Sequence, residues 1–321
     1  MKRREFLFTA AALSATGLAQ SKLTPKDRVN LILAGKKPDR APFTFWHHFG
    51  DAALPGIKHA TSTLEFQRKY HLDIVKVMSD YAYPKSTGAQ WYQLKELVSP
   101  FPEQLVALEL IRDGLAGQKH FLETLFNPWN VAEKLSSKEA VLQLMHDKPQ
   151  ALLDALEAIA KSEANHVRAA LERGVSGVFL AIANAQQGIL TREEYRKFSE
   201  PFDRIVLAAG LDAPLNTLHL HGDKVYLDHF WKGWPAQVIN YDPFGTKVSL
   251  AAARKQFSGI LMGGLNHPTV ATSSPAEITA AKRTAAAAAG AKFICAPGCS
   301  VPDDSTQADL LKLTKALQAP A

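Results

Sequence analysis

Two histidines and a cysteine form the pattern in this sequence with the clearest chemical use. His219 and His221 stand two residues apart in an apolar run that ends at Gly222, and Cys299 lies far downstream. Residues two apart in a β-strand point to the same side, so we expect both imidazoles on one face. A thiol just after a later strand would meet them at the mouth of a barrel. Two imidazoles and one thiolate with an open fourth position are typical of catalytic zinc, so His219, His221 and Cys299 are the predicted ligands. The alternative is two hydrogen-bonded core histidines and a buried thiol.

The cysteine content leaves one further question. Cys295 and Cys299 are the two cysteines of the chain. A disulfide between them would close a very short loop across a strand end, and it requires Cα atoms within about 7 Å with facing side chains. We therefore favour two free thiols, with the disulfide as the alternative.

Residues 1–19 have the layout of a secretory signal. Lys2, Arg3 and Arg4 precede an apolar, alanine-rich stretch over 8–18, and small residues surround position 19. The arginine pair indicates the twin-arginine type of signal. The apolar stretch is short of the ~20 residues that span a bilayer, which disfavours a membrane anchor. We expect cleavage of this segment and a periplasmic or other extracytoplasmic location; an ordinary N-terminal helix is the alternative.

Composition restricts the class of protein. The chain has 321 residues, of which 46% are hydrophobic, and a formal net charge of +6. That is enough apolar material for one large domain, and no linker divides it. The basic residues are spread along the chain without a basic run, which argues against nucleic-acid binding and leaves a small-molecule substrate as the expected partner.

Strand-like and helix-like segments alternate along the chain. Expected strands cover residues 41–46, 73–78, 119–126, 177–182, 215–221, 237–241, 259–265 and 292–296. Capping boxes begin helices at Thr191 and Ser274, and residues 148–173 form one long amphipathic helix that Asp147 could cap. This alternation predicts an α/β protein, a single (β/α)8 TIM barrel over residues 20–321.

Polar side chains follow nearly every expected strand. In such barrels the carboxyl ends of the strands carry the chemistry, so we expect these side chains at one rim. The candidates for proton transfer and substrate orientation are Asp80, His48 and His267. The candidates for substrate contact are Trp46, His47, Tyr81, Asn184, Gln187, Asn240 and Asn266. Because neighbouring residues alternate, one of His47 and His48 should face the pocket, and which one stays open. Turn formation would explain the asparagines equally well.

Several motifs resemble the uroporphyrinogen decarboxylase superfamily, which includes porphyrinogen decarboxylases and cobalamin-linked methyltransferases. The motifs are Asp27-Arg28-Val29, the Lys-Pro-Asp-Arg-Ala-Pro run at 37–42, Gly-Ile-Leu-Thr at 188–191, Gly-Gly-Leu at 263–265 and Pro-Gly-Cys at 297–299. The resemblance covers almost all of the chain after residue 19 and implies a (β/α)8 barrel.

The two branches of this superfamily fit differently. Asp80 matches the decarboxylase aspartate that holds pyrrole nitrogens, yet the arginines that bind acetate and propionate groups are absent from Phe-Trp-His-His-Phe-Gly at 45–50. The methyltransferase branch binds zinc through His-x-Cys and a distant Cys. Here His219 and Cys299 match, and His221 replaces the first cysteine. The resemblance therefore implies zinc, with a corrinoid protein, or its corrinoid, as a further partner.

Three functions remain as hypotheses. The leading one is an exported, zinc-dependent enzyme that performs methyl transfer or related one-carbon chemistry on a small substrate. The first alternative is a metal-free decarboxylase of a porphyrinogen-like or other carboxylated substrate, with Asp80 at its centre. The second alternative is a non-catalytic protein that binds a tetrapyrrole or corrinoid.

Overall fold

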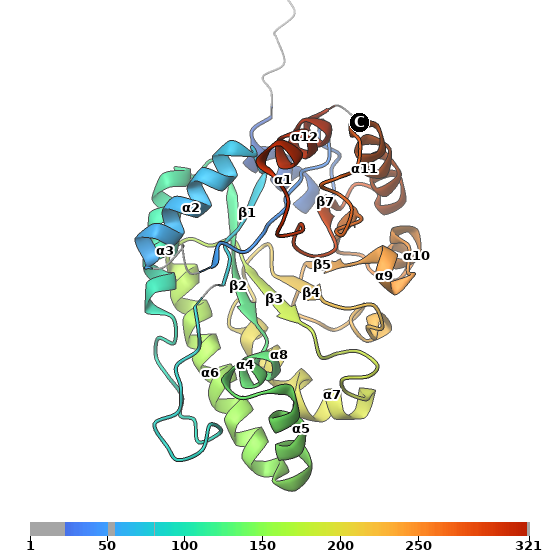
Figure 1. Cartoon of the computed structure of the whole chain (residues 1–321). Helices are drawn as coiled ribbons and strands as arrows, with labels where there is room; N and C mark the ends of the chain where they lie inside the picture. The colour runs from blue at the N-terminus through green and yellow to red at the C-terminus, as the bar shows by residue number, and fades with distance from the viewer. Residues whose placement is uncertain (1–22, 51–54, 80, 320–321) are drawn as a thin grey trace, which may run out of the picture.

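A computed structural model describes residues 23–50, 55–79 and 81–319 (Figure 1). It contains one sheet of seven parallel strands, in which each strand pairs with the next along the chain. The strands are β1 (Ile74–Lys76), β2 (His120–Phe126), β3 (Val178–Ile182), β4 (Thr217–Leu220), β5 (Val238–Tyr241), β6 (Ile260–Leu265) and β7 (Phe293–Pro297). This sequential order with intervening helices confirms the α/β class and the parallel sheet.

Helices surround the curled sheet in Figure 1, most of them on its outer face. They are α1 (Pro25–Leu33), α2 (Gly56–Lys69), α3 (Pro102–Leu115), α4 (Pro128–Leu135), α5 (Lys138–Asp147), α6 (Pro149–Glu172), α7 (Arg192–Phe198), α8 (Glu200–Ala208), the short 3₁₀ helix η2 (Leu227–His229), α9 (Pro243–Thr246), α10 (Leu250–Gln256), α11 (Pro275–Ala289) and α12 (Gln307–Gln318). The arrows of β2 and β3 point toward α4, so α4 lies at the carboxyl end of the sheet (Figure 1).

The segment expected as the first barrel strand is only partly strand-like. It forms a single bridge between Phe43 and Cys295 of β7, and the Phe43 carbonyl accepts a hydrogen bond from the backbone N–H of Asp73, just before β1. The segment thus lies between the two edges of the sheet. Pro42 has no N–H to donate to a ladder, which limits regular pairing here. Seven regular strands are present in the described part of the chain, and a complete eight-stranded barrel is not confirmed.

Side chains alternate between two layers of core, as period-two patterning requires. On β1, Ile74 packs in the inner cluster while Val75 packs outward against α3. On β7, Ile294 faces inward and Cys295 outward. Val29 of α1 joins the inner cluster, so α1 packs against the interior of the sheet.

Local signals in the sequence are confirmed at several helix ends. Thr191 and Ser274 both form capping boxes with the glutamate three residues later. The long helix is present as α6, but Asp147 is not its cap: Asp147 is the last residue of α5, and Lys148 precedes α6 without a side-chain cap. The signal-like residues 1–19 lie outside the described residues. Among the described helices, none combines the length and the apolar character needed to cross a membrane.

Candidate metal centre

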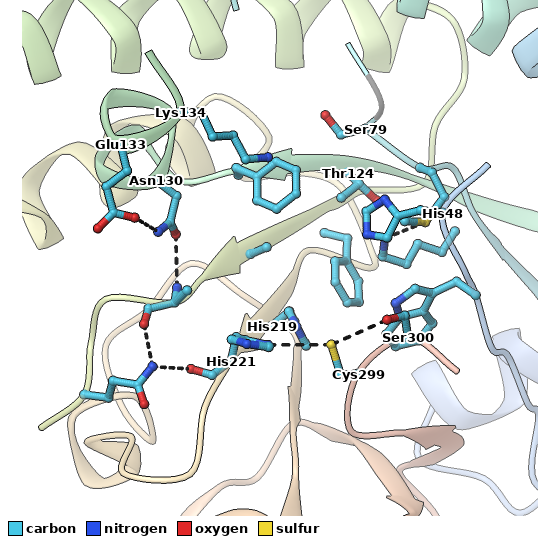
Figure 2. Close-up of a pocket in the computed structure, with 18 of the residues that line it drawn as sticks. His48, Ser79, Thr124, Asn130, Glu133, Lys134, His219, His221, Cys299 and Ser300 are labelled. Atoms are coloured by element: carbon cyan, nitrogen blue, oxygen red, sulfur yellow. Dashed lines mark hydrogen bonds between the residues drawn. The ribbon is translucent and has the colours of Figure 1, made fainter. Parts of the chain in front are cut away.

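His219, His221 and Cys299 come together at the carboxyl ends of β4 and β7. One potential ligand atom from each of them lies within 4.8 Å of the other two. Figure 2 shows the two imidazoles and the thiol gathered on one side of a cavity. The expected strand alternation produces this arrangement, because the intervening Leu220 packs outward in the large core cluster. The chain therefore brings the predicted ligand set together.

Asn240 fixes the orientation of His219. The Asn240 side-chain N–H₂ donates to the carbonyls of Met262 and Pro297, at 3.1 and 3.2 Å. Its Oδ1 therefore faces His219 Nδ1, which lies 2.6 Å away and donates the hydrogen bond. With Nδ1 committed to Asn240, Nε2 is the nitrogen of His219 that is available to Cys299 or to a metal. An amide or carboxylate partner on the far nitrogen is the usual support of a metal-bound histidine.

Gln186 supports the second histidine through the backbone. Its amide donates to the carbonyls of Ala183 and His221, at 2.6 and 3.1 Å. Gly222 has a φ of 120°, and a Cβ there would collide with the Gln186 side chain. Glycine at 222 thus permits both the backbone conformation after His221 and the close approach of Gln186.

Adding a methyl group at Gly222 should therefore displace Gln186 and loosen His221. We expect Gly222→Ala to weaken zinc binding about 10- to 100-fold, as loss of an outer-shell support usually does. Gly233→Ala is the matched control, because Gly233 also has a positive φ, 74°, but a Cβ there meets no atom within 4 Å. Equal zinc affinities of the two variants, measured by competition with a chromophoric chelator, would show that Gln186 does not position the site.

The Cys299 thiol is strongly acidified by its neighbours. Burial would raise its pKa, but hydrogen bonds and charge interactions with His219 and His221 outweigh burial and lower the pKa to about 4. Cys299 Sγ lies 3.6 Å from His221 Nδ1, and the hydrogen bond with Cys299 in turn raises the pKa of His221. A thiolate is the form that binds metal, so this ligand needs no further deprotonation at neutral pH.

The second cysteine serves as an internal control for this acidity. Cys295 is fully buried on the outward face of β7, and burial raises the pKa of its thiol to about 12. At about pH 6, iodoacetamide should therefore modify Cys299 at least about tenfold faster than Cys295, since the thiolate is the nucleophile. The Cys299 rate should persist as the pH falls toward 4, and bound zinc should suppress it. Equal modification of both thiols, read by peptide mass spectrometry, would contradict the assigned pKa shifts. Both cysteines are free, so the alternative disulfide is not formed.

The ligand cluster opens into a main cavity of about 680 Å³. Trp46, Phe179 and Ala181 supply apolar wall, and the Phe179 ring stacks on His219 with centroids 5.1 Å apart. Asn130, Glu133 and Lys134 of α4 line the opposite side (Figure 2). A partly apolar cavity beside three candidate metal ligands is suited to a substrate that would occupy the fourth coordination position of the metal.

The other predicted site residues divide into two groups. Trp46 and His48 line the main cavity, whereas His47 lines a different pocket, so His48 is the one of the pair that faces the cavity. Tyr81 lines a neighbouring chamber, and Asp80 lies outside the described residues.

Besides His47 and Tyr81, four further residues predicted to contact substrate, and one predicted for proton transfer, are not among the described residues that line the main cavity. Asn184 is buried and accepts a hydrogen bond from Asn127, and Gln187 is exposed beside the lining residue Gln186. Asn240 accepts the hydrogen bond from His219 described above. Asn266 follows β6, and its carbonyl accepts hydrogen bonds from the backbone N–H groups of Thr269 and Val270. Nδ1 of His267 lies 3.4 Å from Oδ2 of Asp242.

Lys76 lines the main cavity but was not among the predicted site residues. Lys76 interrupts the apolar run 74–78 at an inward-facing position of β1. Its side chain is buried at 8% exposure, and its Nζ lies 4.7 Å from the centroid of Phe179. A lysine at an inward position of an apolar strand could have been recognised as a cavity residue from period two alone.

The donor set fits zinc on chemical grounds. Two imidazole nitrogens and one thiolate are ligands of intermediate softness, which suit Zn²⁺ and disfavour Mg²⁺ or Ca²⁺. The hydrogen bond between His219 and Asn240 supplies the expected outer support on one of the histidines.

Comparisons with known proteins agree with this architecture. The family model described as uroporphyrinogen decarboxylase (URO-D) matches residues 82–319. Two curated uroporphyrinogen decarboxylases of Klebsiella pneumoniae strains are 28% identical over 166 residues, which is 43% of this chain. The match spans 46% of the length of these relatives.

Solved structures show the same fold at low sequence identity. A methyltransferase from Methanosarcina mazei has a TM-score of 0.73 at 16% identity, and covers 92% of this chain and 98% of its own. A B12-independent methionine synthase from Shewanella sp. W3-18-1, in complex with selenomethionine, has a TM-score of 0.55 at 12% identity. The match covers 88% of this chain and 94% of the synthase chain.

Proposed function

Because this chain belongs to the uroporphyrinogen decarboxylase family, we propose that it is a zinc-dependent enzyme that transfers a methyl or related one-carbon group to or from a small substrate. The observation that carries the proposal is the convergence of His219, His221 and Cys299 within 4.8 Å at the wall of the main cavity. The fold shared with the Methanosarcina mazei methyltransferase is consistent with it.

Each residue of the centre has a separate task in this proposal. His219, His221 and Cys299 hold the metal, while Asn240 and Gln186 keep the two histidines in place. When bound, zinc would supply a Lewis acid that lowers the pKa of a substrate thiol or water. His48 lines the cavity and is the candidate to accept a proton. The orienting role of Asp80 remains a prediction, and His267 is the less favoured base because it is not among the lining residues of the main cavity.

The cavity gives less support to decarboxylation of a porphyrinogen. Such a substrate carries several carboxylates, and no arginine is among the described residues that line the main cavity. Arginine is the side chain that binds carboxylates in a bidentate fashion. Lys76, Lys134 and Lys138 line the cavity and would suit fewer, less rigidly held anionic groups.

Export and a corrinoid partner complete the proposal. The arginine pair in 1–19 supports twin-arginine export to an extracytoplasmic location. A corrinoid protein would deliver or accept the methyl group at the open side of the cavity.

The function can be tested with methylcobalamin as donor and 2-mercaptoethanol as acceptor. In the expected reaction, the thiol sulfur forms a bond to the methyl carbon and loses its proton. The cobalt–carbon bond breaks and leaves its electron pair on cobalt. We expect the zinc-loaded protein to bleach the methylcobalamin spectrum and to produce methylated thiol, detected by mass spectrometry. The zinc-free protein should do neither. Equal turnover with and without zinc would overturn metal-dependent methyl transfer.

A further inference from the structure

A second chamber of about 360 Å³ adjoins the main cavity. The two spaces share His48, Ser79, Phe126 and Lys134 as wall residues. Figure 2 shows Ser79, His48 and Lys134 on the side of the main cavity away from Cys299. The side chamber therefore lies against the main cavity, on the side away from the candidate ligands.

A buried carboxyl group lines the side chamber. Glu163 of α6 has 0% exposure, and neither of its side-chain oxygens has a hydrogen-bond partner among the described residues. Leaving a buried polar group unsatisfied is costly, so a ligand group that hydrogen-bonds to Glu163 would be stabilised here. Two charged groups interact with this carboxyl group: Asp203 raises the pKa of Glu163, and Lys134 lowers it.

The state of this carboxyl group follows from its surroundings. Burial, followed by the charge of Asp203, raises the pKa of Glu163 well above its ordinary value, and Lys134 offsets only part of the shift. A protonated carboxyl group can both donate and accept a hydrogen bond. A neutral O–H or N–H group of a ligand can therefore pair with it.

Aromatic side chains form part of the remaining wall of the side chamber, beside Ala82, Lys85, Val131 and Leu135. Tyr83 and Phe101 meet edge to face with centroids 6.0 Å apart, and Phe126 lies on the shared wall. The Tyr83 hydroxyl already donates to Ser162 at 2.9 Å, so it does not compete for Glu163. Aromatic walls favour a flat ring through offset or edge contacts.

We propose that the side chamber binds the part of the substrate remote from the reacting atom, an uncharged ring whose O–H or N–H group hydrogen-bonds to Glu163. The proposal deepens the function proposed above, on which it rests only for the statement that this ring belongs to the substrate. Ring binding itself requires no metal, so the two ideas can fail separately.

Phenol and toluene are suitable probes, since they have similar shapes and differ in the donor group. We expect Glu163→Leu to lower the preference for phenol over toluene about tenfold, measured as the ratio of their dissociation constants in ligand-observed NMR titrations. Taking the ratio cancels the different hydrophobicities of the probes. Glu163→Gln keeps a donor and an acceptor and should retain most of the preference. An unchanged ratio in Glu163→Leu would overturn the proposal.

Two controls separate this result from other causes. Glu172→Leu, at the exposed end of the same helix, should leave the ratio unchanged. His219→Ala should also leave phenol binding intact, so loss of methyl transfer alone would not bear on the chamber. Glu163→Leu should fold at least as stably as the parent, because it removes an unsatisfied buried group. A marked fall in its melting temperature would show a structural role for Glu163 and would contradict the proposal.

Discussion

Replacing Cys299 by serine, or His219 by alanine, is expected to weaken zinc binding by about a hundredfold or more and to abolish methyl transfer. Structural zinc sites bind with about 10–16 kcal/mol spread over four ligands, so one lost ligand removes a large part of the affinity. The loss should be larger for the thiolate, which carries the negative charge of the set. Competitive zinc titration and elemental analysis of the purified variants measure the effect.

Cys295→Ala provides the matched control for the cysteine. The Cys295 side chain lies on the outward face of β7 and packs in the large core cluster, away from the ligands. Its replacement should cost some stability but leave one zinc ion per chain. If Cys299→Ser retained parental zinc affinity while Cys295→Ala lost it, the ligand assignment would be wrong.

Asp73→Asn is expected to lower the free energy of unfolding by about 3–5 kcal/mol, the usual result of removing one partner from a buried ion pair. The Asp73 side chain has 0% exposure and accepts hydrogen bonds from Arg28 at 2.8 Å, from Arg40 and from the backbone N–H of Phe43 at 2.9 Å. The substitution leaves two guanidinium groups facing a neutral amide. It also weakens the hydrogen bond from the Phe43 backbone N–H, which holds the irregular segment around Phe43 beside β1.

Urea unfolding of the parent and the variant gives the measurement, and Asp39→Asn serves as the control. Asp39 pairs with the same Arg28 at 2.7 Å, but its side chain is 46% exposed. Exposed pairs contribute roughly 0–1 kcal/mol, so this variant should lose far less stability. Equal losses in the two variants would contradict the role assigned to burial.

The parts of the structure that follow a strict period were predictable from the sequence. Alternation placed His219 and His221 on one face, and the rule that parallel strands deliver their carboxyl ends to one rim placed Cys299 beside them. Seven of the eight expected strands are present for the same reason. The remaining one, at 41–46, contains Pro42, which has no N–H to donate to a strand ladder. The pattern of apolar residues that predicted a strand here does not take that missing donor into account.

The supporting residues depend on register, which the sequence does not specify. Asn240 was expected to contact substrate, but in the ladder between β4 and β5 it stands beside His219 and orients that ring. Gln186 rather than its neighbour Gln187 reaches the cavity, because residues in a loop have no fixed alternation. The side chamber around Glu163 was equally inaccessible, since it joins α6 to the segment after β1 across a distance in sequence of about eighty residues.

The central claim is the identity of the three ligands, and zinc K-edge X-ray absorption tests it most directly. The protein, loaded with one equivalent of zinc in thiol-free buffer, should show a sulfur shell at about 2.3 Å and imidazole nitrogens at about 2.0–2.1 Å. The sulfur shell should vanish in Cys299→Ser and remain in Cys295→Ala. A spectrum of the parent protein with only oxygen and nitrogen neighbours, or a sulfur shell that survives in Cys299→Ser, would contradict the proposed centre.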